Sequence, residues 1–197
     1  MSWFSAPQPL LPALLAHHGR WRAGRTALIE GQRRLTWGQL EAATAQIANG
    51  LAASGLGRGA RIAVLMDNSL ELALLLLGIL RSGCVAVPLN VSISDTAVAA
   101  MIEDAAALAV FASGRHCARI DALATTSARV AAAPRFAHGG PGGTWLELNA
   151  WRAAQCTPLG RCSLLTCENV ILSSRRFLLR ARPVYGPPWS HPQHHTL

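Results

Sequence analysis

Two adjacent hydroxyl side chains, Ser173 and Ser174, follow a β-rich run of apolar residues, 170–172. Hydroxyls and backbone N–H groups placed directly after a buried strand can donate hydrogen bonds to a phosphate. The residues that come next, 175–178, are two arginines, a phenylalanine and a leucine. These residues do not readily adopt the positive φ angles that glycine permits, and their bulk keeps backbone amides away from a phosphate. By itself, the serine pair indicates an ordinary strand end.

Two glycine-rich stretches also resemble phosphate-binding loops. The stretch GLGRG, residues 55–59, follows a predicted helix and precedes a predicted strand, which is the reverse of the order that a dinucleotide-binding turn needs. The stretch GGPGG, residues 139–143, lacks the lysine and the hydroxyl residue of a P-loop, and its proline has no N–H group. We interpret the first as a turn and the second as a flexible loop.

Nucleophilic and metal chemistry find little support in the sequence. No G-x-S-x-G turn is present, so nothing specific indicates a hydrolase. The cysteines are odd in number, form no C-x-x-C pair and match no usual zinc spacing, which predicts reduced thiols in a cytoplasmic protein and no metal site. A terminal histidine cluster is interpreted as incidental. The cysteines are Cys84, Cys117, Cys156, Cys162 and Cys167, and the histidines are His191, His194 and His195.

The net charge of +8 is concentrated near the C-terminus. Residues 1–150 carry 12 arginines against 9 acidic residues, whereas residues 151–197 carry 6 against 1. All 18 basic residues are arginine, because the chain contains no lysine. An apolar content of 51% allows most of the chain to bury a core, and no apolar run approaches the ~20 residues of a membrane span.

Short apolar runs alternate with helical patterns from residue 26 to residue 133, which is typical of βα units around a parallel sheet. We predict a hairpin that turns at Gly31 and Gln32, followed by a helix that Thr36 caps with Gln39 completing a capping box. The next helix is capped by Asn68, with Glu71 at the box position, and runs to Gly83, and Ser94 and Asp95 open a third helix. The alternation predicts an α/β fold with a doubly wound, mostly parallel sheet flanked by helices. Further strands are predicted at 61–66, 84–89, 107–112, 128–131 and 168–174, and further helices at 95–104, 116–123 and 144–154.

Three segments resemble the N-terminal part of the AMP-dependent synthetase and ligase family, the adenylate-forming enzymes that include acyl-CoA synthetases. LTWGQL, residues 35–40, resembles the family pattern lTYaeL. GLGRGARIAVLMDNSLEL, residues 55–72, resembles GvgkGDrVavlmpNs.El, with Ala60 where the family usually has aspartate. GILRSGCVAVPLN, residues 78–90, is similar to GilkaGavyvPlnp. The similarity is strong over roughly residues 25–112 and thin from there to residue 174.

The resemblance implies a parent enzyme that uses ATP and Mg²⁺ to convert a carboxylic acid to an acyl-adenylate and then transfers the acyl group to CoA. The family holds the phosphates in a loop similar to YSSGTTGxPKG directly after a strand, so Ser173 and Ser174 match the start of that loop. The rest of the loop is replaced, and the family's catalytic lysine has no counterpart. We expect the chain by itself to be inactive and to require no cofactor.

We therefore expect three parts: a helical lead over 1–24, a partial AMP-binding domain over 25–174 and a disordered tail over 175–197. The tail is rich in arginine, proline and histidine and lacks acidic residues, a composition that packs no core. A shifted reading frame would produce such a tail. The alternative is a non-catalytic binding or regulatory module whose tail binds polyanions; no nucleic-acid motif is present, and we do not expect nucleic acid as the partner.

Overall fold

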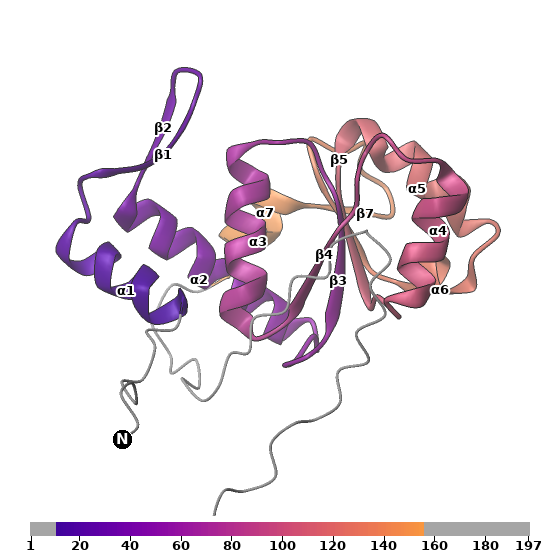
Figure 1. Ribbon diagram of the computed structural model, residues 1–197, viewed down its shortest axis with the longest axis horizontal. Coiled ribbons are helices and arrows are strands. Elements are labelled where there is room, and N and C mark those ends of the chain that lie inside the picture. The colour runs from indigo at the N-terminus through magenta and orange to yellow at the C-terminus, as the bar shows by residue number, and fades with distance from the viewer. Residues whose placement is uncertain (1–10, 156–197) are drawn as a thin grey trace, which may run out of the picture.

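The computed structural model describes residues 11–155 (Figure 1). A helix and a two-stranded hairpin come first, followed by strands and helices that alternate around a five-stranded sheet. No helix within these residues is long and apolar enough to cross a membrane. The helices are α1 (Leu11–Trp21), α2 (Trp37–Ala53), α3 (Leu70–Ser82), α4 (Asp95–Asp104), the short 3-10 helix η1 (Gly114–His116), α5 (Cys117–Ala124), α6 (Ala128–Ala132) and α7 (Leu148–Ala153). The strands are β1 (Thr26–Glu30), β2 (Arg33–Thr36), β3 (Arg61–Leu65), β4 (Val85–Pro88), β5 (Ala109–Ser113), β6 (Arg135–His138) and β7 (Trp145–Glu147).

The five-stranded sheet is parallel throughout and has the order β4-β3-β5-β6-β7. The chain first passes from β3 outward to β4, and then returns to the other side of β3 to place β5, β6 and β7. This reversal of direction is the topological switch of a doubly wound sheet. The predicted α/β fold with a mostly parallel sheet flanked by helices is confirmed.

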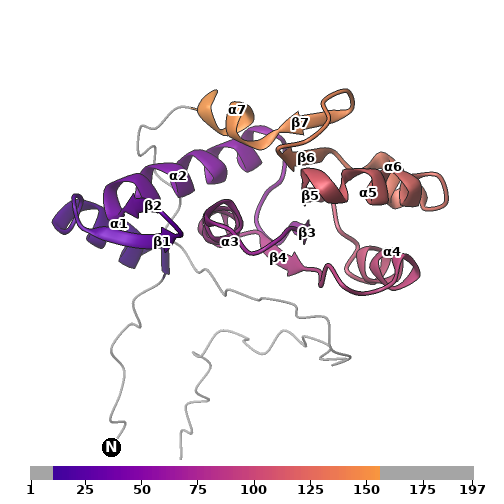
Figure 2. The same ribbon diagram turned by 90° about the horizontal axis from the view of Figure 1, so that it is seen from above.

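Helices cover both faces of the sheet, with α2, α3 and α7 on one side and α4, α5 and α6 on the other (Figure 2). Successive side chains of a strand point to opposite faces. On β3, Ile62 and Val64 join the hydrophobic core that includes α2 and α3, whereas Ala63 and Leu65 join the core that includes α4 and α5. A strand buried on both faces needs apolar residues at every buried position, which explains the unbroken apolar run of residues 62–65 in β3.

Local signals fix several helix ends as predicted. The Thr36 hydroxyl accepts a hydrogen bond from the Gln39 N–H at 3.3 Å, and the Gln39 side chain accepts one from the Thr36 N–H at 2.9 Å, so the capping box of α2 is confirmed. Ser94 caps α4. Gly83 ends α3 in a left-handed conformation with φ +80°, which an L side chain rarely adopts.

The start of α3 differs from the prediction by one residue. Ser69, not Asn68, is the N-cap: its backbone is extended and its hydroxyl accepts the N–H of Leu72 at 3.1 Å. Both residue types are good caps, so composition alone could not separate two adjacent candidates. Glu71 therefore lies in the first turn of α3 and not at the box position, which leaves its carboxylate available to other elements.

The structure also corrects two predictions near the end of the described region. Residues 128–131 form helix α6 instead of a strand, because Ser127 caps the helix by accepting a first-turn N–H at 3.2 Å and the segment is rich in alanine. The strand, β6, comes only after Pro134. The predicted helix over 144–154 is shorter, since its first residues form β7 and the Glu147 carboxylate caps α7. The predicted strand at 168–174 lies outside the described residues.

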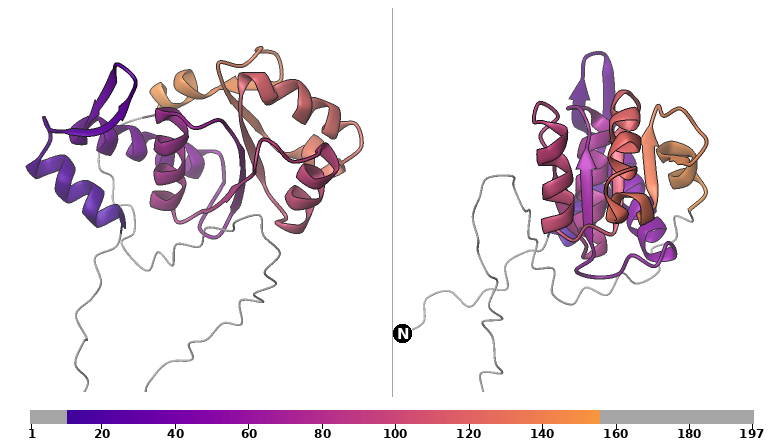
Figure 3. Two further views of the ribbon diagram at one scale, coloured as in Figure 1. Left: turned by 45° about the horizontal axis from the view of Figure 1, so that its top comes forward. Right: turned by 90° about the vertical axis from the view of Figure 1, so that its right-hand side faces the viewer.

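The hairpin and α1 lie together at one end of the molecule, and α4, α5 and α6 lie at the other (Figure 3). The hairpin turns at Gly31, whose φ of +55° confirms the predicted position. α1 packs on α2 through Leu15, which belongs to the same core as α2 and α3. The hairpin reaches the first turn of α3 and so approaches the carboxyl edge of the sheet.

Candidate functional site at the carboxyl edge of the sheet

Polar side chains from three connections gather where the parallel strands end. The chain leaves β3 toward β4 on one side and leaves β5 toward β6 on the other. In open α/β sheets, this divergence creates a crevice in which ligands bind. Asp67 follows β3 and Ser113 ends β5, and the Asp67 N–H donates a hydrogen bond to the Ser113 hydroxyl at 3.0 Å. The two strand ends beside the switch point are thus joined directly.

Two side chains of η1, Arg115 and His116, contact the Asp67 carboxylate. The Arg115 guanidinium donates to its Oδ1 atom, and His116 Nε2 lies 3.3 Å from the same oxygen. Burial on its own would raise the pKa of Asp67, but the hydrogen bonds from Arg115 and His116 outweigh it and hold that pKa below its usual value. Asp67 therefore stays ionised near neutral pH and already has partners within the chain.

A second carboxylate, Glu71, joins the hairpin, α3 and β6. Its side chain is only 7% exposed. Arg33 of β2 donates to both carboxylate oxygens, with the longer contact 3.2 Å, and His138 at the end of β6 places Nε2 3.8 Å from Oε2. The hydrogen bond from Arg33 lowers the pKa of Glu71 against the opposing effect of burial, and the charge of His138 lowers it further. Glu71 therefore acts as a structural junction.

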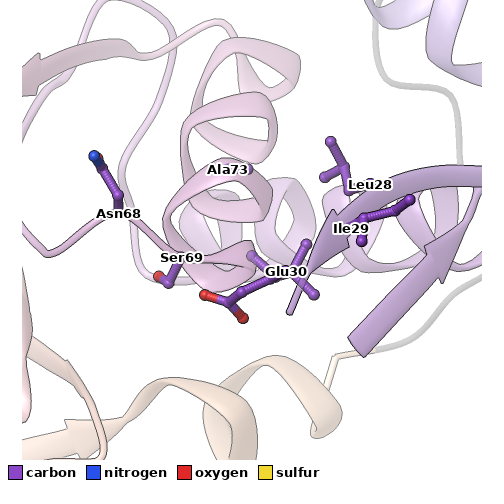
Figure 4. Close-up of a pocket in the computed structure, with 7 residues that line it drawn as sticks. Leu28, Ile29, Glu30, Asn68, Ser69 and Ala73 are labelled. Atoms are coloured by element: carbon purple, nitrogen blue, oxygen red, sulfur yellow. The ribbon is translucent and has the colours of Figure 1, made fainter. Parts of the chain in front are cut away.

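An open pocket of about 290 Å³ lies between the hairpin and the start of α3 (Figure 4). Its polar lining consists of Glu30, Asn68 and Ser69, but Glu30 pairs with Arg33 at 3.0 Å and Ser69 caps α3. Among the contacts of the described residues, the Ser69 hydroxyl has no basic side chain as a partner that could remove its proton. The arrangement can accommodate a group by shape, and it offers no nucleophile. The remaining lining residues are Leu28, Ile29, Leu70 and Ala73.

The described thiols are buried and inert. Burial raises the pKa of Cys84, and burial together with the nearby Asp121 carboxylate raises the pKa of Cys117 to about 11. A protonated thiol is a poor nucleophile and a poor metal ligand. Within residues 11–155, no group of three or more histidine, cysteine, aspartate and glutamate side chains is placed to hold a metal ion. The other three cysteines lie outside the described residues.

The two predicted phosphate-site serines, Ser173 and Ser174, lie outside the described residues, as do the terminal histidines. The glycine-rich stretches are both connections: residues 55–59 turn from α2 to β3, with Gly55 and Gly59 at positive φ, and residues 139–143 link β6 to β7. Neither lies between a strand end and the start of a helix, where a phosphate-binding loop would stand.

Sequence reasoning missed both carboxylate clusters. Arg33 and Glu71 are 38 residues apart, and Arg115 and Asp67 are 48 apart, so no local pattern links them. A usable signal was present, since Asp67, Ser113 and His138 each end or closely follow an apolar strand. Parallel strands bring such residues to one edge of the sheet.

Comparison with known proteins matches residues 15–147 to the model of the AMP-binding enzyme family. A curated relative, the 3-hydroxybenzoate–CoA ligase of Aromatoleum sp. (strain CIB), is 42% identical over 89 residues. That alignment covers 45% of this chain and 17% of the relative. The chain therefore spans only a small part of the length of the curated relatives that it matches.

Solved structures share the fold. The anthranilate CoA ligase AuaEII in complex with anthranoyl-AMP gives a TM-score of 0.72 at 22% identity, over 81% of this chain and 31% of that one. A benzoate CoA ligase from Burkholderia xenovorans LB400 gives 0.65 at 23% identity, also over 81% and 31%. The family match extends over most of the described residues, from α1 to β7. The chain belongs to the AMP-binding enzyme family.

Proposed function

We propose that this chain provides the amino-terminal scaffold of an acid–CoA ligase and does not by itself form an acyl-adenylate. In this proposal the parent activity is ATP- and Mg²⁺-dependent activation of a carboxylic acid, followed by transfer of the acyl group to CoA. The observation that carries the scaffold role is the family match over residues 15–147. These residues include the sheet and most of the side chains of the two hydrophobic cores that cover its faces.

The inactivity of the chain alone is argued from its residues. Charge that develops on phosphates during adenylation needs oriented N–H donors and cations. After Ser174 the chain has arginines and a phenylalanine in place of the expected glycine and threonine residues, and it contains no lysine. Within residues 11–155, the carboxylates of Asp67 and Glu71 are neutralised by the chain's own side chains.

The direct test is carboxylate-dependent ATP–pyrophosphate exchange with the purified 197-residue chain. Because curated relatives are named as hydroxybenzoate–CoA and benzoate–CoA ligases, 3-hydroxybenzoate, 4-hydroxybenzoate and benzoate are the first acids to try. We expect no exchange above the level without added acid. Acid-dependent exchange that is retained through repeated purification would disprove the inactivity proposal.

The scaffold role is tested by a chimaera that joins residues 1–147 of this chain to the remainder of the 3-hydroxybenzoate–CoA ligase of Aromatoleum sp. If residues 1–147 form a competent scaffold, the chimaera catalyses exchange with 3-hydroxybenzoate. The control chimaera carries Gly78→Trp, which disrupts the contact between α2 and α3. A folded chimaera that shows no exchange, beside an active parent ligase, would count against the scaffold role.

The origin of residues 175–197 has a separate test. We propose that this segment comes from a shifted reading frame, because the resemblance stops within a functional motif and the composition changes at the same position. The encoding DNA should then contain, in another frame after the Ser174 codon, the sequences Gly-Thr-Thr-Gly and Pro-Lys-Gly.

We also propose a cytoplasmic location, which the free thiols of Cys84 and Cys117 support because the cytosol keeps thiols reduced.

A further inference from the structure

The outer face of α1 carries apolar and basic side chains. Its inner face packs against the rest of the molecule: Leu15 is buried in the core, and the ring centroids of His18 and Trp37 are 4.6 Å apart. The opposite side of the helix is exposed to solvent. Its large side chains, separated by the three- and four-residue steps that keep residues on one side of a helix, are Leu14, His17 and Trp21, together with Arg20.

Trp21 is the most exposed large apolar residue of the described region, with 71% of its surface accessible. Leu14 on the same face is 39% exposed. The Arg20 guanidinium lies over the Trp21 ring, 5.7 Å from its centroid, and the His17 ring lies 6.3 Å from it. Exposed apolar side chains beside an arginine, on a helix at the end of the molecule (Figure 1), form a candidate interaction surface.

The basic charge of this face has no acidic counterpart nearby in the sequence. Arg22 and Arg25 extend the exposed segment after α1, and no acidic residue occurs before Glu30. In the described structure, Glu30 pairs with Arg33, and Glu41, whose side chain lies beside Gly19 of α1, pairs with Arg81. We name the set Leu14, His17, Arg20, Trp21, Arg22 and Arg25 the Trp21 face.

We propose that the Trp21 face docks on the surface of a bilayer that contains anionic phospholipid. α1 would lie in the plane of the interface, with Trp21 and Leu14 among the acyl chains and headgroups and the arginines at the phosphates. This orientation is the one that amphipathic surface helices adopt, and tryptophan and arginine are the residues typical of that depth. Charge and an exposed tryptophan would also fit a single-stranded nucleic acid, but a bilayer in addition gives the exposed Leu14 side chain an apolar environment.

The test is flotation of the full 197-residue chain with vesicles. Vesicles of phosphatidylcholine with phosphatidylglycerol should carry the chain upward, and vesicles of phosphatidylcholine alone should not. Trp21→Ala should weaken binding about tenfold, as expected for loss of a large apolar side chain from an apolar environment. Each of Arg20→Gln and Arg22→Gln should weaken vesicle binding about fivefold, because one arginine near an anionic membrane raises the affinity by about that factor.

Matched controls separate this face from the rest of the chain. Leu146→Ala removes an apolar side chain that is 51% exposed on β7, and Arg61→Gln removes an exposed arginine at the start of β3. Both should bind vesicles like the unaltered chain, and circular dichroism should be unchanged for all variants. The basic residues 175–197 are present in every variant, so they cannot produce a difference between them.

Two results would overturn the proposal. One is equal vesicle binding by Trp21→Ala and the unaltered chain, which would place any attraction elsewhere. The other is tight binding to single-stranded DNA that is sensitive to Arg20→Gln, without binding to vesicles; the face would then recognise polyanions and not a bilayer. Neither result depends on adenylation, so the outcome is independent of the proposed scaffold function.

Discussion

At the scale of single residues, Glu71 of α3 contacts side chains of both β2 and β6. It is nearly buried and receives hydrogen bonds from Arg33 and a contact from His138. Glu71→Gln would remove the negative charge and leave Arg33 without its main partner. Because Arg33 itself is largely solvated, we expect a loss of about 1–2 kcal/mol in the free energy of unfolding, below the 3–5 kcal/mol of a fully buried pair. Urea unfolding measures this, with Asp104→Asn, at an exposed position of α4, as the control.

The same carboxylates predict how stability depends on pH. Asp67 and Glu71 have pKa values lowered in the folded protein, so each contributes stability above its unfolded pKa and loses it as pH falls through the folded pKa. We expect the free energy of unfolding to decline from about pH 5 downward, since free carboxyl groups titrate near pH 4. The decline should be shallower in Glu71→Gln. An identical pH profile in both proteins would contradict the assigned role of Glu71.

Residues also show how far sequence reasoning reaches. The Thr36–Gln39 capping box and the Ser94 cap were predicted because each depends on residues only three positions apart. Glu71 was predicted to complete a capping box with Asn68, but its side-chain partners are Arg33 of β2 and His138 of β6. Side chains joined by tertiary packing leave no spacing that a single sequence can reveal. The predicted phosphate-site residues, Ser173 and Ser174, stay a prediction.

At the scale of elements, the contact between α2 and α3 depends on a small residue. A Cβ atom added at Gly78 would lie 2.5 Å from Ile47 Cγ2, whereas one added at Gly57 would meet nothing within 4 Å. Gly78→Ala should therefore force the helices apart and cost about 1–3 kcal/mol, although alanine favours helix more than glycine does. Gly57→Ala should change stability by less than about 0.5 kcal/mol. Thermal or urea unfolding compares the two, and equal stability would refute close packing at Gly78.

Elements with strong periodicity were predicted well, and short ones were not. β3 and α3 contain unbroken apolar runs, so their type was predicted correctly, although the start of α3 was misplaced by one residue. Residues 128–131 have too few positions to show a period, and their conformation follows from the Ser127 cap and from Pro134, which together delay the strand to β6. β7 has only three residues and is defined by its parallel pairing with β6. The sequence of so short a segment does not indicate which strand will lie beside it.

At the scale of the whole molecule, the alternation of strands and helices was enough to predict a doubly wound sheet, because right-handed crossovers permit few other arrangements. The position of the switch beside β3 was not predictable, since strand order depends on packing between distant segments. It is this order that brings Asp67, Ser113 and Arg115 to one crevice. There the Asp67 carboxylate is paired with Arg115 of the same chain.

The same topology leaves β7 at the edge of the sheet, and this predicts how the molecule associates. Among residues 11–155, no strand pairs with the outer side of β7, and Leu146 on that strand is 51% exposed. Such an edge can pair with a second molecule, and a lysine on an edge strand opposes this. Leu146→Lys should therefore reduce concentration-dependent association in sedimentation velocity. Leu108→Lys, at a residue that is 50% exposed but precedes β5, adds the same charge away from that edge and should have a smaller effect. If both lysines reduce association equally, net charge and not the β7 edge governs it.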